Sequence, residues 1–271
     1  MTVSEIYKVL DEAAPKALSD EYVQKYGAYD NSGVLLDTGS EVEKIVFSLD
    51  LSLGAIALAK REGATLIVTH HPAIYGKIDR LSVCEPLGEK LLDCVKNGIS
   101  VISMHLNLDT VEGGIDDCLR EGIVKGIEKR TGKTAINESV RRMHELSRGG
   151  YGSVYPVAEI SAGELAAAID GEFRTSVKLT GDKNKKISRA ASFCGAGVDE
   201  ESIAFAVKNG ADAIVSSDWK HHLLALCLQT GAVAVQLSHY ASEEYGFEKY
   251  YEKMRESIGA TCLLYRDDQL L

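Results

Sequence analysis

Residues 63–72 read GATLIVTHHP. Within them, Thr65–Val68 is a short, mostly apolar run, which predicts a strand buried on both faces. A helix predicted over 53–61 is closed by Gly63 just before this strand, and a similar apolar strand is predicted over 44–49. Strands that are apolar on both faces and alternate with helices are typical of largely parallel sheets. The stretch therefore predicts an α/β fold.

The same alternation continues along the chain, with a helix predicted over 87–96, a strand over 100–104 and a helix over 114–124. The segment 128–152 is then rich in charge and poor in periodic apolar residues, which is typical of a connection. We therefore predict two domains. The first is an N-terminal α/β half over 1–127, and the second, over 128–271, comprises the connecting segment and a C-terminal α/β half.

The C-terminal half contains a helix start and a predicted hairpin. Ser161 and Glu164 form the pattern of a capping box, which indicates that a helix begins there. The runs 176–179 and 187–193 flank turn-forming residues at 181–184, so we expect them to pair as a hairpin. Strands and helices then alternate to the end of the chain.

Residues 210–217, GADAIVSS, resemble residues 63–70, GATLIVTH, which indicates an internal repeat. Each copy is followed by a histidine pair, a predicted helix, a glycine and a strand that ends in histidine. These histidines are His70, His71 and His105 in the first copy and His221, His222 and His239 in the second. We therefore predict two related, interlocked α/β subdomains with mainly parallel sheets. Because open parallel sheets bind ligands at the carboxyl ends of their strands, we expect the site there, in the cleft between the subdomains.

Two segments carry candidate metal ligands in pairs. His70 and His71 precede Pro72, which ends the strand in a turn and lets both imidazoles project from one loop. His239 and Glu243 are four residues apart at the start of a helix, so one helical turn can put both on the same face. Taken singly, the first pair can also be a buried structural histidine beside an exposed one, and the second can be an ordinary surface pair.

Asp109 follows the strand that ends at His105, a position where an aspartate is commonly a turn or cap residue. Jointly, however, three imidazoles and two carboxylates are predicted at one edge of the sheet. Nitrogen and oxygen ligands of this kind suit Fe, Mn, Zn, Co or Ni. Because five ligands are too many for one catalytic ion with open positions, we predict two divalent first-row metal ions per chain that share a bridging carboxylate.

Composition argues against several other partners and sites. Lys and Arg total 30 against 40 Asp and Glu, a net charge of −10, which opposes binding to nucleic acid or to anionic lipid. The longest apolar runs are far shorter than the roughly 20 residues of a membrane span, and residues 1–5 do not open a signal peptide, so we expect a cytoplasmic protein. The six cysteines include no CxxC pair, and residues 195–197 (GAG) lack the third glycine of a dinucleotide fingerprint.

These motifs resemble a family, the NIF-three-like dinuclear-metal-centre hexameric proteins, often labelled GTP cyclohydrolase I type 2 homologues. The resemblance covers nearly the whole chain and is carried by the segments DNSG at 30–33, THHP at 69–72, NLD at 107–109, GG at 113–114 and HYASE at 239–243. It implies that the metal ligands are His70, His71, Asp109, His239 and Glu243. It also implies a toroidal homohexamer with the metal sites facing an interior cavity.

The resemblance further implies roles for the remaining histidines. Residues 218–222 match the family's second histidine-containing motif, so His221 and His222 are expected to contact substrate or to transfer a proton. His105 is expected to be a hydrogen-bonding partner of the ligands. For each of the three, a buried histidine with a structural hydrogen bond is the alternative.

Two functions stay open at this point. The first is a metal-dependent hydrolase, in which a metal-activated water attacks a small-molecule substrate. The family label suggests a cyclohydrolase that acts on a purine nucleotide. The alternative is a non-enzymatic ring that stores or delivers metal, or binds a regulatory partner. Both functions would use the same ligands.

Overall fold

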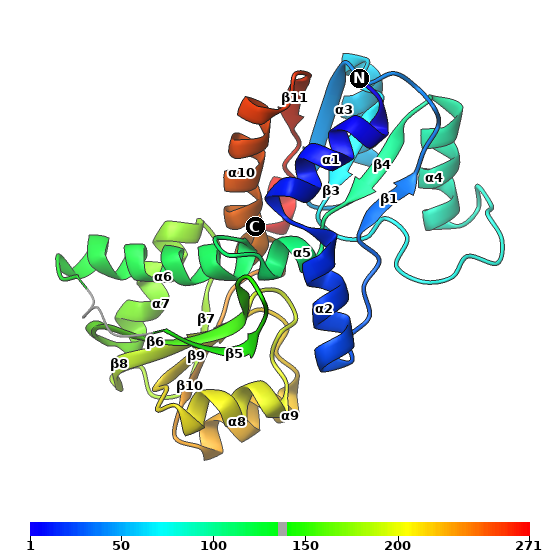
Figure 1. The fold of residues 1–271 in the computed structure, drawn as a ribbon. Helices are drawn as coiled ribbons and strands as arrows, with labels where there is room; N and C mark the ends of the chain where they lie inside the picture. Colours follow the sequence, from blue (N-terminus) through cyan, green and yellow to red (C-terminus); the bar gives the residue numbers. More distant parts are fainter. Residues whose placement is uncertain (135–139) are drawn as a thin grey trace. The chain divides into compact units, whose positions relative to one another are not determined.

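The computed structural model describes residues 1–134 and 140–271. These residues form two compact units. Unit 1 comprises Met1–Val111 and Phe247–Asp267, and unit 2 comprises Glu112–Gly246 and Asp268–Leu271. Figure 1 shows the chain coloured along the sequence, with the helices and strands labelled. The α/β class that the sequence predicts is confirmed.

Unit 1 is built on a five-stranded sheet in the order β1-β4-β3-β2-β11 (Figure 1). The strands are β1 Gly33–Leu36, β2 Lys44–Ser48, β3 Leu66–Thr69, β4 Ser100–Ser103 and β11 Thr261–Leu264. All neighbours are parallel except β1 and β4, which are antiparallel, so this sheet is mainly parallel as predicted. Its helices are α1 Val3–Ala13, α2 Lys16–Tyr26, α3 Leu53–Glu62, α4 Pro86–Lys96 and α5 Leu106–Thr110.

The core of unit 1 lies on both faces of this sheet, because successive strand residues point in opposite directions. Val46 and Ile67 pack in one cluster with Ile56 of α3 and Leu91 of α4. Phe47, the next residue of β2, instead contacts aromatic rings of α10, which runs from His239 to Ser257. The sheet is therefore buried on both sides, as its apolar strands predict.

Unit 2 contains a six-stranded sheet in the order β5-β6-β8-β9-β10-β7. The strands are β5 Arg141–Glu145, β6 Gly150–Ser161, β7 Lys178–Thr180, β8 Lys186–Ser192, β9 Ala213–Ser216 and β10 Val233–Gln236. Its helices are α6 Ile115–Thr131, α7 Ala162–Phe173, α8 Glu200–Lys208 and α9 His221–Gln229. Only β8, β9 and β10 pair in parallel, so this sheet is mixed rather than mainly parallel.

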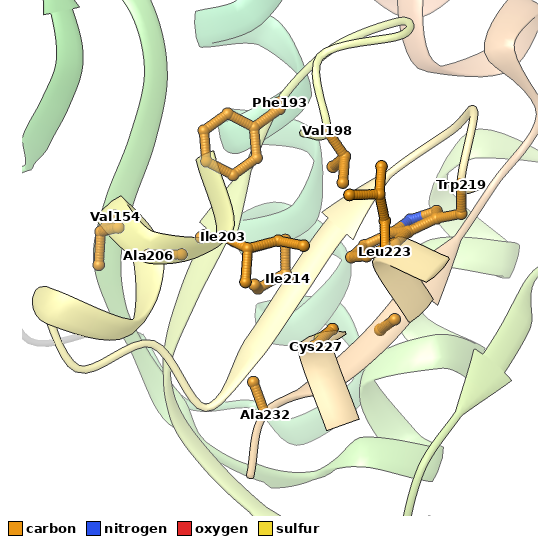
Figure 2. Packing of buried hydrophobic residues seen from close by; sticks show 12 residues of the cluster. Val154, Phe193, Val198, Ile203, Ala206, Ile214, Trp219, Leu223, Cys227 and Ala232 are labelled. Carbon is orange, nitrogen blue, oxygen red and sulfur yellow. The ribbon is translucent and has the colours of Figure 1, made fainter. Parts of the chain in front are cut away.

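One apolar cluster of unit 2 joins its central strands to two helices. Ile214 of β9 packs with Ile203 of α8 and Leu223 of α9, and Figure 2 shows these side chains with Cys227 and Phe193. The helix α7 begins at the predicted capping box, in which the Ser161 side chain accepts from the Glu164 backbone. This packing fixes the central parallel strands, whose ends carry polar residues.

The predicted hairpin between 176–179 and 187–193 is wrong. β7 pairs antiparallel with β10, and β8 lies between β6 and β9. A turn-rich linker permits a hairpin but does not require one, and here the three residues of β7 cover the open edge of β10 instead. The charged segment 128–152 contains the end of α6, the strand β5 and the start of β6, which pairs antiparallel with β5. Its residues 135–139 lie outside the described residues.

The division into units differs from the predicted one after residue 127. α6 continues through Thr131 and packs on α7 and β6, so the whole helix belongs to unit 2. At the other end of the chain, β11 pairs in parallel with β2, which returns Phe247–Asp267 to unit 1. Long-range strand pairing of this kind leaves no local signal in the sequence.

The internal repeat corresponds to two β-α-β segments. β3, α4 and β4 form the first, and β9, α9 and β10 form the second; in both, the two strands are adjacent and parallel. Gly98 and Gly231 precede the second strands with positive φ, as expected for glycines that follow a helix. Across the described ranges, no helix combines the length and apolar character that a membrane crossing requires.

Candidate metal centre

Unit 1 brings three histidines and an aspartate together at the carboxyl ends of β3 and β4. These strands are parallel neighbours, with Thr69 opposite Ser103, so the residues that follow them emerge at the same edge. The ring centroids of His70 and His71 are 4.9 Å apart, and those of His70 and His105 are 5.2 Å apart. One ligand atom from each of His70, His105 and Asp109 lies within 4.8 Å of the others. Their spacing fits a metal site.

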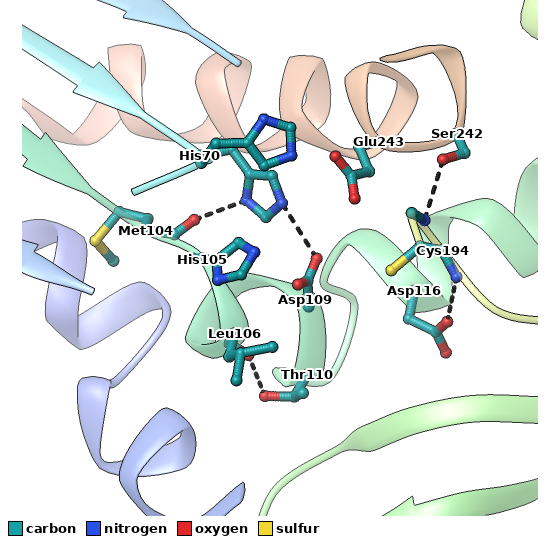
Figure 3. A network of polar contacts seen from close by, with 12 residues as sticks. His70, Met104, His105, Leu106, Asp109, Thr110, Asp116, Cys194, Ser242 and Glu243 are labelled. Carbon is teal, nitrogen blue, oxygen red and sulfur yellow. Dashed lines mark hydrogen bonds and ion pairs between the residues drawn. The ribbon is translucent and has the colours of Figure 1, made fainter. Parts of the chain in front are cut away.

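The orientation of His70 identifies which ring nitrogen faces this cluster. His70 is fully buried, and its Nδ1 lies 2.8 Å from the carbonyl oxygen of Met104 (Figure 3). Because a carbonyl only accepts, Nδ1 carries the hydrogen in this bond, and a neutral ring then has its lone pair on Nε2. That nitrogen is 3.4 Å from Asp109 Oδ1. A lone pair and a carboxylate repel at this distance unless a proton or a metal cation lies between them, so this pair of groups suits a metal ion.

His71 and His105 are each held at Nδ1 by a carboxylate of unit 1. His71 Nδ1 lies 2.8 Å from Asp50 Oδ1, and His105 Nδ1 lies 2.7 Å from Asp30 Oδ1. A metal-ligating histidine commonly donates its other ring nitrogen to such an acceptor, which fixes the ring. The resemblance implies that His105 is a partner of the ligands, and its ring lies beside those of His70 and His71.

The pKa values of Asp30 and His105 reflect this pairing. Burial alone would raise the pKa of Asp30, but hydrogen bonds from His105, Ser19 and Ser32 outweigh burial and hold the pKa well below its usual range. Burial alone would lower the pKa of His105, but the bond to Asp30 and the charge of Asp109 outweigh it and raise that pKa. Asp30 is therefore ionised and able to orient the ring.

Unit 2 carries the second pair of predicted ligands at the start of α10. His239 Nδ1 lies 2.8 Å from Asp218 Oδ2, and His239 Nε2 lies 3.2 Å from Glu243 Oε2. The offset of four residues puts both side chains on one face of the helix. Glu243 is 4% exposed, whereas Asp218 is exposed. His239 thus repeats the arrangement of unit 1, with one ring nitrogen on an oxygen acceptor and the other toward a carboxylate.

The loop after β8 approaches Glu243 closely. Gly195 has φ +56°, and a Cβ added there would lie 2.3 Å from Glu243 Oε1. The Gly195 backbone N–H donates to Ser242 Oγ at 3.2 Å. The sulfur of Cys194 lies within 4.8 Å of a Glu243 carboxylate oxygen. Gly195, the first residue of the GAG motif, is therefore part of this site, and a side chain there would displace the carboxylate.

A buried acid at the start of α6 holds the same loop. Asp116 accepts from the backbone N–H of Cys194 at 3.2 Å and from that of Gly152 at 3.0 Å. Burial raises the pKa of Asp116 to about 7, although these two bonds and the charge of Arg142 oppose the shift. The adjacent Asp117 binds Arg142 through two contacts of 2.8 Å. The loop position is thus fixed from within unit 2.

The structure places the second histidine pair differently from the first. His221 and His222 lie on the first turn of α9, four and five residues beyond Ser217, and both are exposed. His222 Nε2 is 3.5 Å from Glu200 Oε1. Their predicted role in substrate contact or proton transfer stays a prediction.

Four residues that contribute to these sets were not predicted. Asp30, Asp50 and Asp218 each accept from a histidine, and Cys194 lies beside Glu243. Sequence signals existed for three of them. Asp30 and Asp218 fall in segments that carry the family resemblance. Asp50 comes two residues after β2, the same edge that carries the ligands, so the rule on strand ends could have found it.

Comparison with known proteins agrees with the resemblance. The family model described as Duf34/NIF3 (NGG1p interacting factor 3) matches residues 1–265. A Clostridium perfringens protein named GTP cyclohydrolase 1 type 2 homolog is 29% identical, over 95% of this chain and 93% of its own. The structure of a Staphylococcus aureus hypothetical protein matches with a TM-score of 0.81 at 22% identity, covering 98% of this chain and 97% of that chain. Reduced HcgD from Methanocaldococcus jannaschii matches with a TM-score of 0.76 at 25% identity, covering 97% of both chains. The chain therefore belongs to the Duf34/NIF3 family.

Proposed function

We propose that this protein is a metal-dependent hydrolase that uses two divalent first-row metal ions. In this proposal the ligands are the five residues that the sequence singled out, namely His70, His71, Asp109, His239 and Glu243. His105 is added as a sixth candidate because its ring lies beside those of His70 and His71.

The observation that carries the proposal is the common orientation of four histidines. His70, His71, His105 and His239 each place Nδ1 within 2.8 Å of an oxygen acceptor. A histidine with a purely structural role can use either ring nitrogen in its hydrogen bond. Rings that are all held at Nδ1 leave Nε2 available to a metal ion. Two of these rings then direct Nε2 at a carboxylate. Imidazole and carboxylate donors of this kind bind Fe, Mn, Co, Ni or Zn.

When bound, such a pair of ions would supply Lewis acidity and an activated water for attack on a carbon or phosphorus centre. The chain's own part is to fix the ligands. Asp30, Asp50 and Asp218 keep the three rings that they bind from rotating, and they increase the basicity of the ligating nitrogens. Asp109 and Glu243 supply the negative charge that balances the cations, in positions that are largely closed to solvent.

The substrate that we propose is a small molecule, with a purine nucleotide as the first candidate. Support for the nucleotide comes from the name that relatives such as the Clostridium perfringens protein carry. We also propose a homohexamer on the basis of the family resemblance, and light scattering of the purified protein would give the number of chains directly.

The test is turnover by protein that has been stripped of metal and reloaded with Fe, Mn, Co, Ni or Zn, one at a time. GTP and a panel of phosphoesters and cyclic amides are offered to the wild-type protein and to Glu243→Gln. His144→Ala, which changes a histidine of β5 instead, is the matched control. We expect metal-dependent hydrolysis by the wild type and by His144→Ala. The rate of hydrolysis by Glu243→Gln should be at least about 100-fold lower.

Metal-replete wild type that hydrolyses none of these compounds would contradict the hydrolase proposal. Rapid exchange of the bound ions with a chelator would then favour the alternative, a protein that stores or delivers metal. The two functions are therefore separated by measurements on one preparation.

A further inference from the structure

We propose that the thiolate of Cys194 is a further metal ligand, which gives unit 2 a nitrogen, an oxygen and a sulfur donor in His239, Glu243 and Cys194. This inference rests on the proposed function, because it concerns the same metal ions. It assigns a role to a cysteine that belongs to no CxxC pair and that the sequence does not single out.

The sulfur of Cys194 is buried and lies next to a candidate metal ligand. Cys194 is 2% exposed, and its Sγ lies within 4.8 Å of a carboxylate oxygen of Glu243. Metal–sulfur and metal–oxygen bonds of roughly 2.3 and 2.1 Å place two ligands of one tetrahedral ion about 3.6 Å apart. A side-chain shift of about 1 Å therefore suffices for both groups to bind one ion.

Unit 2 fixes Cys194 by its backbone on both sides. The Cys194 N–H donates to Asp116, and the Tyr151 hydroxyl donates to the Cys194 carbonyl at 2.6 Å. The next residue, Gly195, donates to Ser242 Oγ, and its carbonyl accepts from Ser216 Oγ at 3.3 Å. Ser242 is the neighbour of Glu243 on α10, so these bonds hold the loop against the carboxylate.

Cys227, another buried cysteine of unit 2, has different surroundings. Cys227 packs among apolar residues such as Ile214 and Leu223, and burial raises its pKa to about 11. A small apolar thiol fits that environment. Cys194 instead has the buried carboxylate of Glu243 as a neighbour, so that its sulfur lies next to an oxygen donor with which it could share a cation. Metal binding would supply that cation and release the thiol proton to solvent.

A sulfur ligand has a consequence for metal choice. Thiolates are soft ligands, so Cys194 would favour iron, cobalt or zinc over manganese in the site that contains it. The donor set would also differ between the two units, since the candidate ligands of unit 1 are imidazoles and a carboxylate.

Cobalt substitution tests the proposal with a signal that only a sulfur ligand produces. Metal-free wild type, Cys194→Ser and Cys227→Ser are loaded with Co²⁺, and both the near-ultraviolet absorption and the cobalt content per chain are measured. We expect a sulfur-to-cobalt charge-transfer band in the wild type and in Cys227→Ser. The band should be absent from Cys194→Ser.

A wild type that binds cobalt without this band, or a Cys194→Ser protein that retains it, would overturn the sulfur ligand and leave the proposed function standing. A wild type that binds no cobalt, iron or zinc would overturn both. If Cys194→Ser fails to fold, X-ray absorption of the zinc-loaded wild type decides the question without a variant. The proposal requires a sulfur scatterer at roughly 2.3 Å from zinc, and a shell of nitrogen and oxygen alone contradicts it.

Discussion

The two β-α-β segments have the same local structure but use their histidine pairs differently. After β3, His70 and His71 follow the strand directly, and His70 is fully buried. After β9, four further residues, 217–220, precede His221 and His222, which therefore fall on the exposed first turn of α9. The spacing between strand end and histidine, and not the presence of a histidine pair, decides whether the rings meet other ligand groups.

The ends of the second strands show the complementary pattern. β4 leads into His105 and α5, which carries Asp109, and β10 leads into α10, which carries His239 and Glu243. Both segments thus place an imidazole and a carboxylate about four residues apart just after a strand. The repeat predicts the histidine after each of these strands but does not include the carboxylate four residues later. It also does not identify the contribution of β8, which is followed by Cys194 and Gly195.

The largest effect on metal affinity is expected at Gly195, the glycine whose Cα lies against the Glu243 carboxylate. Gly195→Ala would push its Cβ against Glu243 Oε1, at 2.3 Å in the present geometry, and should weaken metal binding about 100-fold. Gly231→Ala is the matched control, because Gly231 also has positive φ but has no atom within 4 Å of an added Cβ among the described residues. Both substitutions should cost roughly 1–2 kcal/mol of folding free energy from backbone strain. Competition with a chelator measures the affinity, and equal affinities in the two variants would be evidence against this role of Gly195.

The second prediction concerns the ion pairs of Asp117, the neighbour of the Asp116 that holds the Cys194 loop. Asp117 is 3% exposed and binds both Arg120 and Arg142, so Asp117→Asn should destabilise the protein by about 3 kcal/mol at pH 7. Burial raises the pKa of Asp117, but the bonds from Arg142, Gly113 and Arg120 outweigh it and lower that pKa.

A lowered pKa means that the stabilisation is present above the unfolded value of about 3.9 and is lost as pH falls through the folded value. The difference in unfolding free energy between wild type and Asp117→Asn should therefore shrink as the pH falls from 7 toward 3. Urea titrations of the metal-free proteins measure it, with Asp170→Asn on the exposed side of α7 as the control. A difference that is independent of pH over this range would refute the assignment.

A third prediction compares the carboxylates that orient the rings in the two units. Asp50→Asn in unit 1 and Asp218→Asn in unit 2 keep an oxygen acceptor but lose the charge, so each should weaken metal binding about 10-fold. Asp50→Ala and Asp218→Ala should each bind metal about 100-fold more weakly than the wild type. Isothermal titration with Zn²⁺ gives the affinities. Unchanged affinity in both alanine variants would show that these rings are not metal ligands.

The smallest effect is expected for the exposed histidine pair. His221→Ala and His222→Ala should leave metal affinity within about twofold of the wild type, because neither is grouped with the candidate ligands of the described residues. If they contact substrate, as the family resemblance implies, these variants should lower kcat/KM at unchanged metal content. A loss of metal in either variant would mean that the two histidine pairs are equivalent after all.

The sequence predicts those features that depend on local pattern. The apolar strands β2, β3, β4, β9 and β10 were identifiable because they are buried on both faces, and the ligand candidates followed from their ends. The pairing of β7 with β10 was missed because the turn residues at 181–184 fit a hairpin equally well. The roles of Asp50, Cys194 and Gly195 depend on contacts between segments far apart in the chain, which neither periodicity nor spacing records.

Metal content by elemental analysis is the most direct test of the central claim. The wild type, purified without a polyhistidine tag, is compared with His70→Ala from unit 1, Glu243→Ala from unit 2 and the control His144→Ala. The account predicts about two first-row metal ions per chain in the wild type and in His144→Ala, and loss of metal from both ligand variants. Metal-free wild type, or ligand variants that keep the full metal load, would contradict it and leave these histidines with a structural role only.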